Sequence, residues 1–224
     1  FVSFSSNVTI GDSNYSTQGI FVYDFLLYKT DDAGNVLWSK RMPGSGDQFA
    51  RDVDVDQTTG RIALYGRLGA TMSVDGIALN AQGIAPVLIV LDSAGTALWG
   101  ETFPGNNVLP HEVKFTAAGD LLMTGEYRNQ VSIDTASYQK FDPLNTIQAR
   151  NPFIAKYSAA GTYLWSNAFP VSFSANVVFA QYEGYFVSLA EAPNGDIFLG
   201  INFRDLIRVD VDTITGTSNF SEDI

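Results

Sequence analysis

The sequence predicts an all-β protein made of about three repeated four-stranded units and part of a fourth. The phrase Ala-Gly-x-x-Leu-Trp recurs at residues 33–38, 94–99 and 160–165, and it contains every tryptophan of the chain. Short runs rich in β-branched and aromatic residues stand on both sides of each copy, as expected for strands. No segment has the apolar period of an amphipathic helix. We therefore expect strands and turns, repeated along the chain.

Each unit begins with a predicted hairpin around the recurring phrase. An apolar run that suits a strand buried on both faces leads through a glycine-containing turn into the Leu-Trp strand. In the first unit this turn is 31–35. The apolar runs of the three units lie at 24–29, 87–92 and 152–157.

A second hairpin and an alternating tail complete each unit. The strands of the second hairpins are expected at 52–56 and 60–66, at 112–115 and 119–125, and at 186–190 and 195–200. The tails lie at 72–75, 131–134 and 207–210. Their alternation of apolar and polar residues predicts a half-exposed edge strand or a connection between units. Residues 8–12 resemble a fourth copy of this tail.

Four strands in a unit of about 60 residues favour one architecture, the β-propeller. We expect residues 1–20 to be the tail of a preceding repeat, and 21–83, 84–149 and 150–224 to be three blade repeats of one propeller domain. Propellers have about four to eight blades, each packing its apolar face on the next. The chain is therefore expected to be part of a larger or completed ring, in which further repeats or another chain cover the open blade faces.

The first unit carries a spaced pattern of acidic, aromatic, basic and glycine residues: Asp24, Phe25, Lys29, Gly34, Trp38, Gly60 and Gly66. In this pattern the chain resembles, unit by unit, the bacterial β-propeller repeat family. By alignment of the sequence alone, Pro86 and Pro152 replace Asp24, and Leu91 replaces Lys29. The resemblance implies a secreted or surface-exposed bacterial protein, often with many repeats, and it implies no activity common to the family.

Composition agrees with a secreted, folded protein. Hydrophobic residues make up 46% of the chain, enough for a sizeable core. Cysteine is absent, which excludes disulfides, thiolate metal ligands and a cysteine nucleophile. No apolar run approaches the roughly 18 residues of a membrane helix, and residues 1–4 lack the basic and apolar regions of a signal peptide. We expect a secreted or cell-surface location without a membrane span.

The charge balance disfavours nucleic acid as a partner. There are 24 acidic and 13 basic residues, so the net charge is −11. A polyanion is bound mainly by lysine and arginine that neutralise phosphates, and here the basic residues are scattered. An acidic surface suits an extracellular protein or one that meets divalent cations.

Asp52, Asp54 and Asp56 alternate along one predicted strand, which places their carboxylates on one face. Calcium takes about six to eight oxygen ligands, usually from a tight loop, so a straight strand needs help from neighbours to bind it. Two interpretations stay open, a solvated strand face and a calcium site. No other cofactor is expected.

His111 is the single histidine of the chain, and it stands beside Glu112. Adjacent residues of a strand point to opposite faces, so these two cannot share a proton as a catalytic pair. There is also no Gly-x-Ser-x-Gly motif for a nucleophilic serine. We expect His111 to be a structural or surface residue and predict no catalytic residue.

The third unit contains a longer insert at 171–185 with aromatic residues among Ser, Asn and Gly: Phe173, Phe179, Tyr182 and Tyr185. On an extended loop these rings could contact a ligand or a protein. The alternative is that they cap an exposed blade face.

The tryptophans, Trp38, Trp99 and Trp165, invite a sugar-stacking interpretation. Their constant place in the unit instead predicts that they fill the space between neighbouring sheets.

The sequence therefore favours a non-enzymatic structural or binding module of a secreted or cell-surface bacterial protein, in contact with protein or glycan. The alternative is a propeller-fold enzyme, a glycan lyase or hydrolase, with carboxylates about 5–9 Å apart at the ring centre.

Overall fold

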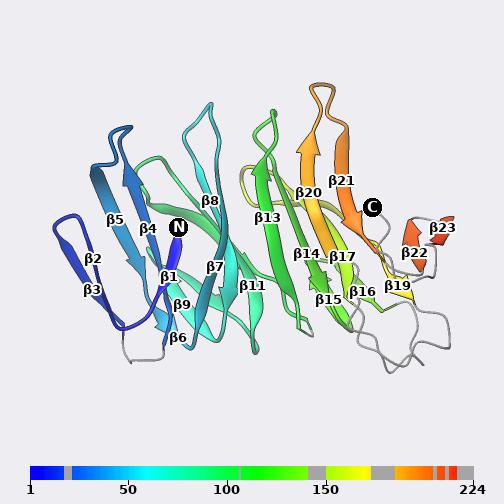
Figure 1. Cartoon of the computed structure of the whole chain (residues 1–224), viewed down its shortest axis with the longest axis horizontal. Coiled ribbons are helices and arrows are strands. Elements are labelled where there is room, and N and C mark those ends of the chain that lie inside the picture. The colour runs from blue at the N-terminus through cyan, green and yellow to red at the C-terminus, as the bar shows by residue number, and fades with distance from the viewer. Residues whose placement is uncertain are drawn as a thin grey trace. The chain divides into compact units, whose positions relative to one another are not determined.

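The computed structural model describes residues 1–17, 22–105, 107–140, 150–172, 185–203, 206–209 and 212–215. These residues form strands and turns and no helix, which confirms the predicted all-β class. No helix long and apolar enough to cross a membrane lies among them. The chain divides into two compact units, residues 1–102 and residues 103–224, and their strands are labelled in Figure 1.

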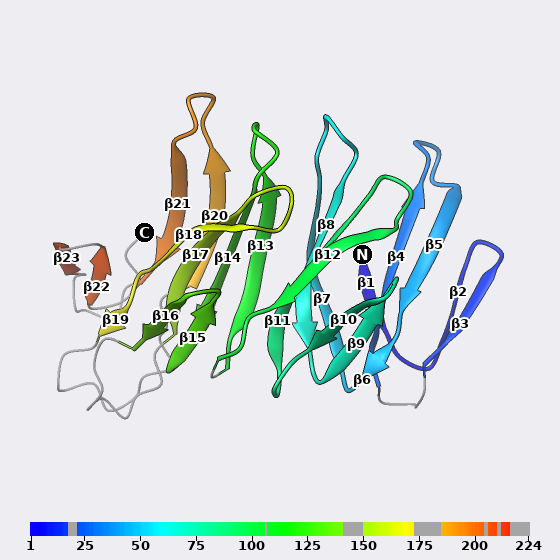
Figure 2. The same cartoon turned by 180° about the vertical axis from the view of Figure 1, so that it is seen from behind.

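Unit 1 holds a four-stranded antiparallel sheet with the order β12-β11-β8-β7. Beside it lie the sheets β1-β4-β5 and β10-β9-β6, and the hairpin β2-β3 lies next to β5 (Figure 2). The strands are β1 (Val2–Phe4), β2 (Asn7–Ile10), β3 (Ser13–Ser16), β4 (Asp24–Thr30), β5 (Val36–Met42), β6 (Gly44–Ser45), β7 (Gln48–Val55), β8 (Ile62–Leu68), β9 (Thr71–Val74), β10 (Ile77–Asn80), β11 (Ala85–Leu91) and β12 (Ala97–Thr102).

Unit 2 repeats this plan. Its four-stranded sheet has the order β13-β14-β17-β18, accompanied by the hairpins β15-β16 and β20-β21 and the sheet β19-β22-β23. The strands are β13 (Leu109–Phe115), β14 (Leu121–Tyr127), β15 (Gln130–Ile133), β16 (Ala136–Gln139), β17 (Asn151–Tyr157), β18 (Tyr163–Ala168), β19 (Val171–Ser172), β20 (Tyr185–Glu191), β21 (Ile197–Asn202), β22 (Leu206–Val209) and β23 (Asp212–Thr215).

Each four-stranded sheet joins the second hairpin of one sequence unit to the first hairpin of the next. In unit 1, β8 pairs with β11 over seven residues, across the boundary at 83/84. In unit 2, β14 pairs with β17 in the same way, across the boundary at 149/150. The alternating tails form the small hairpins β9-β10 and β15-β16, which lie in sequence between the second and third strands of these sheets.

The middle strands are the most buried part of each sheet. All seven residues of β11 and all seven of β14 are buried. In unit 1, Phe25, Met42 and Leu64 belong to one apolar cluster. The apolar runs identified in the sequence therefore become the middle of the sheets, where every backbone group has a partner on both sides.

The Ala-Gly pair of the recurring phrase lies in three equivalent turns, between β4 and β5, between β11 and β12, and between β17 and β18. Asp31 Oδ1 accepts hydrogen bonds from the backbone N–H groups of Ala33 and Asn35, at 3.0 and 2.8 Å. Gly34 has a φ of 84°, a left-handed conformation that glycine adopts without steric cost. In the β11–β12 turn, Asp92 Oδ1 accepts the equivalent hydrogen bonds from the N–H groups of Ala94 and Thr96.

Trp38 packs against the next sheet of unit 1, as its repeated position predicts. A Cβ added to Gly95, in the β11–β12 turn, would lie 3.2 Å from the Trp38 ring. The neighbouring Leu37 is 57% exposed, so the strand turns its tryptophan inward and its leucine outward. In unit 2, Trp165 is 37% exposed, so the prediction does not extend to that tryptophan.

The tail hairpins dock on the tryptophan strand through one repeated contact. The Tyr15 hydroxyl lies 2.8 Å from Ser39 Oγ, and in unit 2 the Tyr138 hydroxyl lies 2.9 Å from Ser166 Oγ. The middle repeat has Leu79 and Gly100 at these two positions. A Cβ on Gly100 would lie 3.2 Å from Leu79 Cδ2, so the absence of a side chain makes room for leucine. A hydrogen bond thus holds this hairpin in two of the repeats, and an apolar contact holds the equivalent hairpin in the middle repeat.

Strand registers correct the alignment of the family pattern. The residues paired with the three tryptophans are Lys29, Val90 and Lys156. Lys29 is therefore replaced by Val90, and the alignment with Leu91 was wrong by one residue. Counting back from these positions aligns Asp24 with Ala85 and Asn151, in place of Pro86 and Pro152.

Asp24 and Asn151 are both buried at the start of a strand, and both join that strand to a neighbouring one. Asp24 accepts a hydrogen bond of 2.7 Å from Arg41 Nε. Asn151 donates to the Tyr127 carbonyl at 3.2 Å and accepts from the Val171 N–H at 3.0 Å. The acidic residue of the family pattern is structural in this chain, because its oxygens are engaged within the fold.

Candidate functional site

The predicted aspartate row lies on the first strand of the sheet in unit 1. Asp52 and Asp54 are half-buried and both have interaction partners, whereas Val53 and Val55 are 38% and 40% exposed. The carboxylates of Asp52 and Asp54 are therefore only partly solvated, and the choice between a solvated face and a calcium site stays a prediction. The apolar side chains occupy the more open face of β7, and the aspartates the more covered one.

Asp56 closes the β7–β8 turn. Its carboxylate accepts hydrogen bonds from the Thr58 N–H at 2.9 Å and from the Thr59 hydroxyl. The Thr59 hydroxyl, followed by the Thr58 N–H, holds the pKa of Asp56 below its ordinary value. Within the described ranges, no group of three or more His, Cys, Asp or Glu side chains could hold a metal ion.

Most of the aromatic insert lies outside the described residues, including Phe173, Phe179 and Tyr182. Tyr185 is described by its backbone, which begins β20 and pairs with Asn202. The predicted contact loop therefore stays a prediction.

His111 lies at an irregularity in β13, between Pro110 and Val113, where the pairing with β14 shifts. Its Nε2 is 3.1 Å from Glu126 Oε2, whereas Glu112 pairs with Lys114 at 2.7 Å. Adjacent residues of the strand thus serve different partners, which is why the sequence neighbour of His111 is not its structural neighbour.

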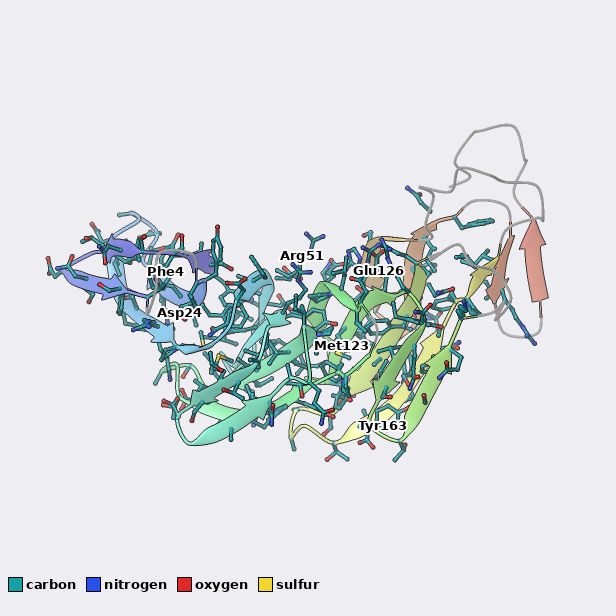
Figure 3. The ribbon with its side chains drawn as sticks, turned by 90° about the horizontal axis from the view of Figure 1, so that it is seen from below. Phe4, Asp24, Arg51, Met123, Glu126 and Tyr163 are labelled. Atoms are coloured by element: carbon teal, nitrogen blue, oxygen red, sulfur yellow. The ribbon has the colours of Figure 1, made fainter. Side chains whose placement is uncertain are left out.

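Glu126 is the centre of an ionic cluster that the sequence did not reveal. Glu126, labelled in Figure 3, is 3% exposed. Arg150 Nη1 lies 2.9 Å from its Oε1, whereas His111 lies at its Oε2. Both contacts have ion-pair distances without the alignment of a good hydrogen bond. A buried carboxylate needs such partners, because burial without them costs several kcal/mol. The sequence signal that could have identified Glu126 is its position as the one acidic residue of the buried strand β14.

The equivalent position in unit 1 carries different chemistry. Arg67 lies opposite Phe49 in β7, as Glu126 lies opposite Leu109 in β13. The Arg67 guanidinium is 4.9 Å from the centre of the Phe49 ring, which in turn contacts the Tyr23 ring at 5.2 Å. The strands of the two units repeat, but the groups at this end of the sheet do not.

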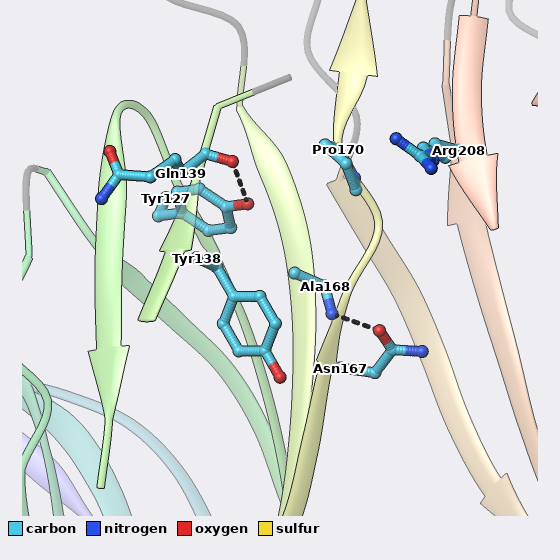
Figure 4. Close-up of a pocket in the computed structure, with 7 residues that line it drawn as sticks. All are labelled: Tyr127, Tyr138, Gln139, Asn167, Ala168, Pro170 and Arg208. Carbon is cyan, nitrogen blue, oxygen red and sulfur yellow. Dashed lines mark hydrogen bonds between the residues drawn. The ribbon is translucent and has the colours of Figure 1, made fainter. Parts of the chain in front are cut away.

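A pocket opens beside the same end of the sheet in unit 2 (Figure 4). Its volume is about 240 Å³. It lies among the end of β14, the hairpin strand β16, the end of β18 and strand β22. The lining residues are Tyr127, Tyr138, Gln139, Asn167, Ala168, Pro170 and Arg208.

Hydrogen bonds fix the walls of this pocket. The buried Tyr127 hydroxyl donates to the Gln139 carbonyl at 3.2 Å, and burial raises the pKa of Tyr127, so it stays a neutral donor. The Tyr138 hydroxyl donates to the Ser166 carbonyl at 2.7 Å. Asn167 Oδ1 accepts from the Ala168 N–H at 2.8 Å. The pocket is thus preformed within unit 2.

The described lining of the pocket combines polar side chains with flat apolar ones. Arginine and carboxamide side chains stand beside a tyrosine and a proline, and none of the described residues that line the pocket is a carboxylate. Glycoside hydrolysis uses a pair of carboxylates. Glu126, next to the pocket residue Tyr127 in the chain, contacts Arg150 through one oxygen and His111 through the other.

No protein-family model matches the chain, and no curated protein matches it.

Proposed function

We propose that this chain is a binding module of a secreted or cell-surface protein, and that it contacts a glycan or a protein at the end of the unit 2 sheet where β14 ends. The proposed activity is non-covalent recognition. The scaffold supplies rigid strands, and the side chains at this end supply selectivity.

One observation carries the proposal: the pocket lies where the two units differ most. In unit 1, β10 ends at Asn80 and β11 begins at Ala85, whereas in unit 2 β16 ends at Gln139 and β17 begins only at Asn151. Likewise β6 and β7 are separated by two residues, but β19 ends at Ser172 and β20 begins at Tyr185. Longer connections on a regular scaffold are where binding groups concentrate.

The proposal includes a propeller-type arrangement of the sheets as blades. It is supported by the antiparallel order of neighbouring strands in both four-stranded sheets, by the repeated hairpins and by the resemblance to bacterial β-propeller repeats. In this arrangement further repeats or another chain cover the blade faces. The location outside the cell is supported by the absence of cysteine and by the net charge of −11.

The test uses the purified chain on an array of bacterial and host glycans and of extracellular matrix proteins. Saturable binding that is lost on heating supports the proposal. Binding to none of these ligands at micromolar protein contradicts it. The same protein is incubated with polysaccharides, and the release of reducing ends or unsaturated uronides is followed. Catalytic turnover would replace the proposal with the enzyme alternative.

A further inference from the structure

The strand β4 of unit 1 is covered along only part of one edge. β1 pairs with residues 24–26 and lies beside one end of β4 in Figure 1, whereas residues 28–30 are exposed. Among the described residues, no other strand pairs with β4 on this side. Tyr28 is 36% exposed, but its equivalents Ile89 and Ala155, in strands that are paired along their full length, are 0% exposed. We call residues 28–30 on this side the open edge of β4.

Strand β21 of unit 2 lacks the partner that its equivalents have. In the two four-stranded sheets, the equivalent strands β8 and β14 each pair with a following apolar strand. Within the described part of the chain, β21 pairs with β20 alone. Phe198 of β21 is 63% exposed, whereas its equivalents Ala63 and Leu122 are 0% and 1% exposed. The open edge of β4 therefore has room for a strand of the kind that β21 presents.

A charged pair accompanies this strand pairing in unit 2. Lys156 of β17 is 3.0 Å from the carboxylate of Asp120, the residue before β14. In unit 1, Val90 and Arg61 stand at these two positions of the sheet, so the acid is present where the lysine is present and absent where it is absent. The partner of a strand with lysine at this position is therefore expected to carry an acid just before it.

The two unpaired strands carry these matching charges. Lys29 is the equivalent of Lys156, because both pair with the tryptophan of the next strand. It is exposed and forms no ion pair with the described residues. Asp196 follows a turn glycine and precedes β21, as Asp120 precedes β14. It is exposed too, and its carboxylate accepts from Asn194 Nδ2 at 2.7 Å.

We propose that β21 of one copy of this chain adds to the open edge of β4 in a second copy. The register is that of β14 on β17, so residues 197–199 run antiparallel to residues 28–30, with Phe198 opposite Lys29. Lys29 then forms an ion pair with Asp196 of the second copy. The six-residue strand β21 displaces β1, which pairs with β4 at three positions.

This contact joins different surfaces of the two copies. A head-to-tail contact continues from copy to copy until it closes into a ring or forms a filament. Main-chain hydrogen bonds supply the affinity of an added strand, and the exposed edges give it a place to bind. The inference names the other chain of the propeller-type arrangement and rests on that part of the proposed function. Ligand binding on the array does not depend on it.

The test measures self-association of the full chain by sedimentation velocity between about 1 and 100 µM. The average mass should rise with concentration. Phe198→Ser should weaken association at least about tenfold, because the ring is buried only in the assembly. The melting temperature of the dilute chain should not change, since Phe198 is exposed there.

Charge reversal tests the register of the two strands. Lys29→Glu and Asp196→Lys should each weaken association about tenfold, because each places like charges together. Both changes in one chain should restore it, since every contact then pairs Glu with Lys again. Asp12→Lys, which reverses another exposed acid, is the control and should associate like the parent chain.

The opposite results overturn the inference. A chain that stays monomeric at about 100 µM leaves the open edge to another occupant. Association that is insensitive to Phe198→Ser, or that the double charge reversal does not restore, uses other surfaces. Array binding by a monomeric chain would refute this inference alone, whereas association without array binding would refute the binding module alone.

Discussion

The docking of the tail hairpins can be tested by converting the packed pair of the middle repeat into the hydrogen-bonded pair of the others. The perturbations are Leu79→Tyr, Gly100→Ser and the double variant. In the parent protein, a Cβ on Gly100 would lie 3.2 Å from Leu79 Cδ2 and 3.1 Å from the Leu88 carbonyl oxygen. These approaches are closer than ordinary van der Waals contact, so Gly100→Ser should overpack the site.

The expected size follows from that geometry. Overpacking costs about 1–3 kcal/mol, so Gly100→Ser should lower the free energy of unfolding by that amount. Leu79→Tyr should cost a similar amount, because Leu79 is 4% exposed in a filled site. The double variant should regain at least about 1 kcal/mol relative to the sum, since serine and tyrosine then form the contact seen at 2.8 Å between Tyr15 and Ser39.

The assay is urea unfolding followed by tryptophan fluorescence and circular dichroism, with the midpoint and slope compared among variants. Leu79→Tyr combined with Lys29→Gln is the control and should be additive within about 0.5 kcal/mol. Additivity of Leu79→Tyr and Gly100→Ser to within the same margin would refute the idea that the hairpins dock equivalently.

Three further predictions concern the ionic groups. Glu126→Gln should lower the free energy of unfolding by about 3–5 kcal/mol, because Arg150 loses its buried counter-charge, while Glu112→Gln should cost less than about 1 kcal/mol in the same urea titration. The hydrogen bond from Lys40, followed by that from the Ala97 N–H, holds the pKa of Asp75 below 3.8; its contribution to stability is therefore present above that pH and is lost on further acidification. Asp75→Asn should thus be less stable than the parent by up to about 1 kcal/mol at pH 7, and a gap that persists unchanged at pH 2.5 would contradict this cause. Millimolar calcium should leave the melting temperature unchanged, because Asp56 is engaged in its turn, and a rise that Asp52→Asn abolishes would restore the calcium site.

Strands could be predicted from the sequence because their signals are local. The apolar run at 24–29 becomes β4, and the run at 60–66 overlaps β8, since alternation and turn glycines act within a few residues. Which strands share a sheet is not local. The pairing of β8 with β11 spans the intervening hairpin, and a repeated sequence looks the same whichever strand is taken as the first.

The candidate site was predictable only in part for the same reason. His111 was singled out by its chemistry, but its partner Glu126 belongs to the next strand, and an irregular pairing in β13 brings the two together. The pocket combines residues from β14, β16, β18 and β22, whose proximity depends on tertiary structure. The half-burial of Asp52 and Asp54 likewise depends on what covers their face of the strand, and alternation alone says nothing about that.

The proposed recognition at the end of the unit 2 sheet can be seen directly in a crystal structure of the chain with a ligand that binds it on the array. We expect the ligand to contact Tyr138, Asn167 and Pro170 in the pocket of unit 2. A ligand bound elsewhere on the chain, with this pocket empty, would contradict the proposed site.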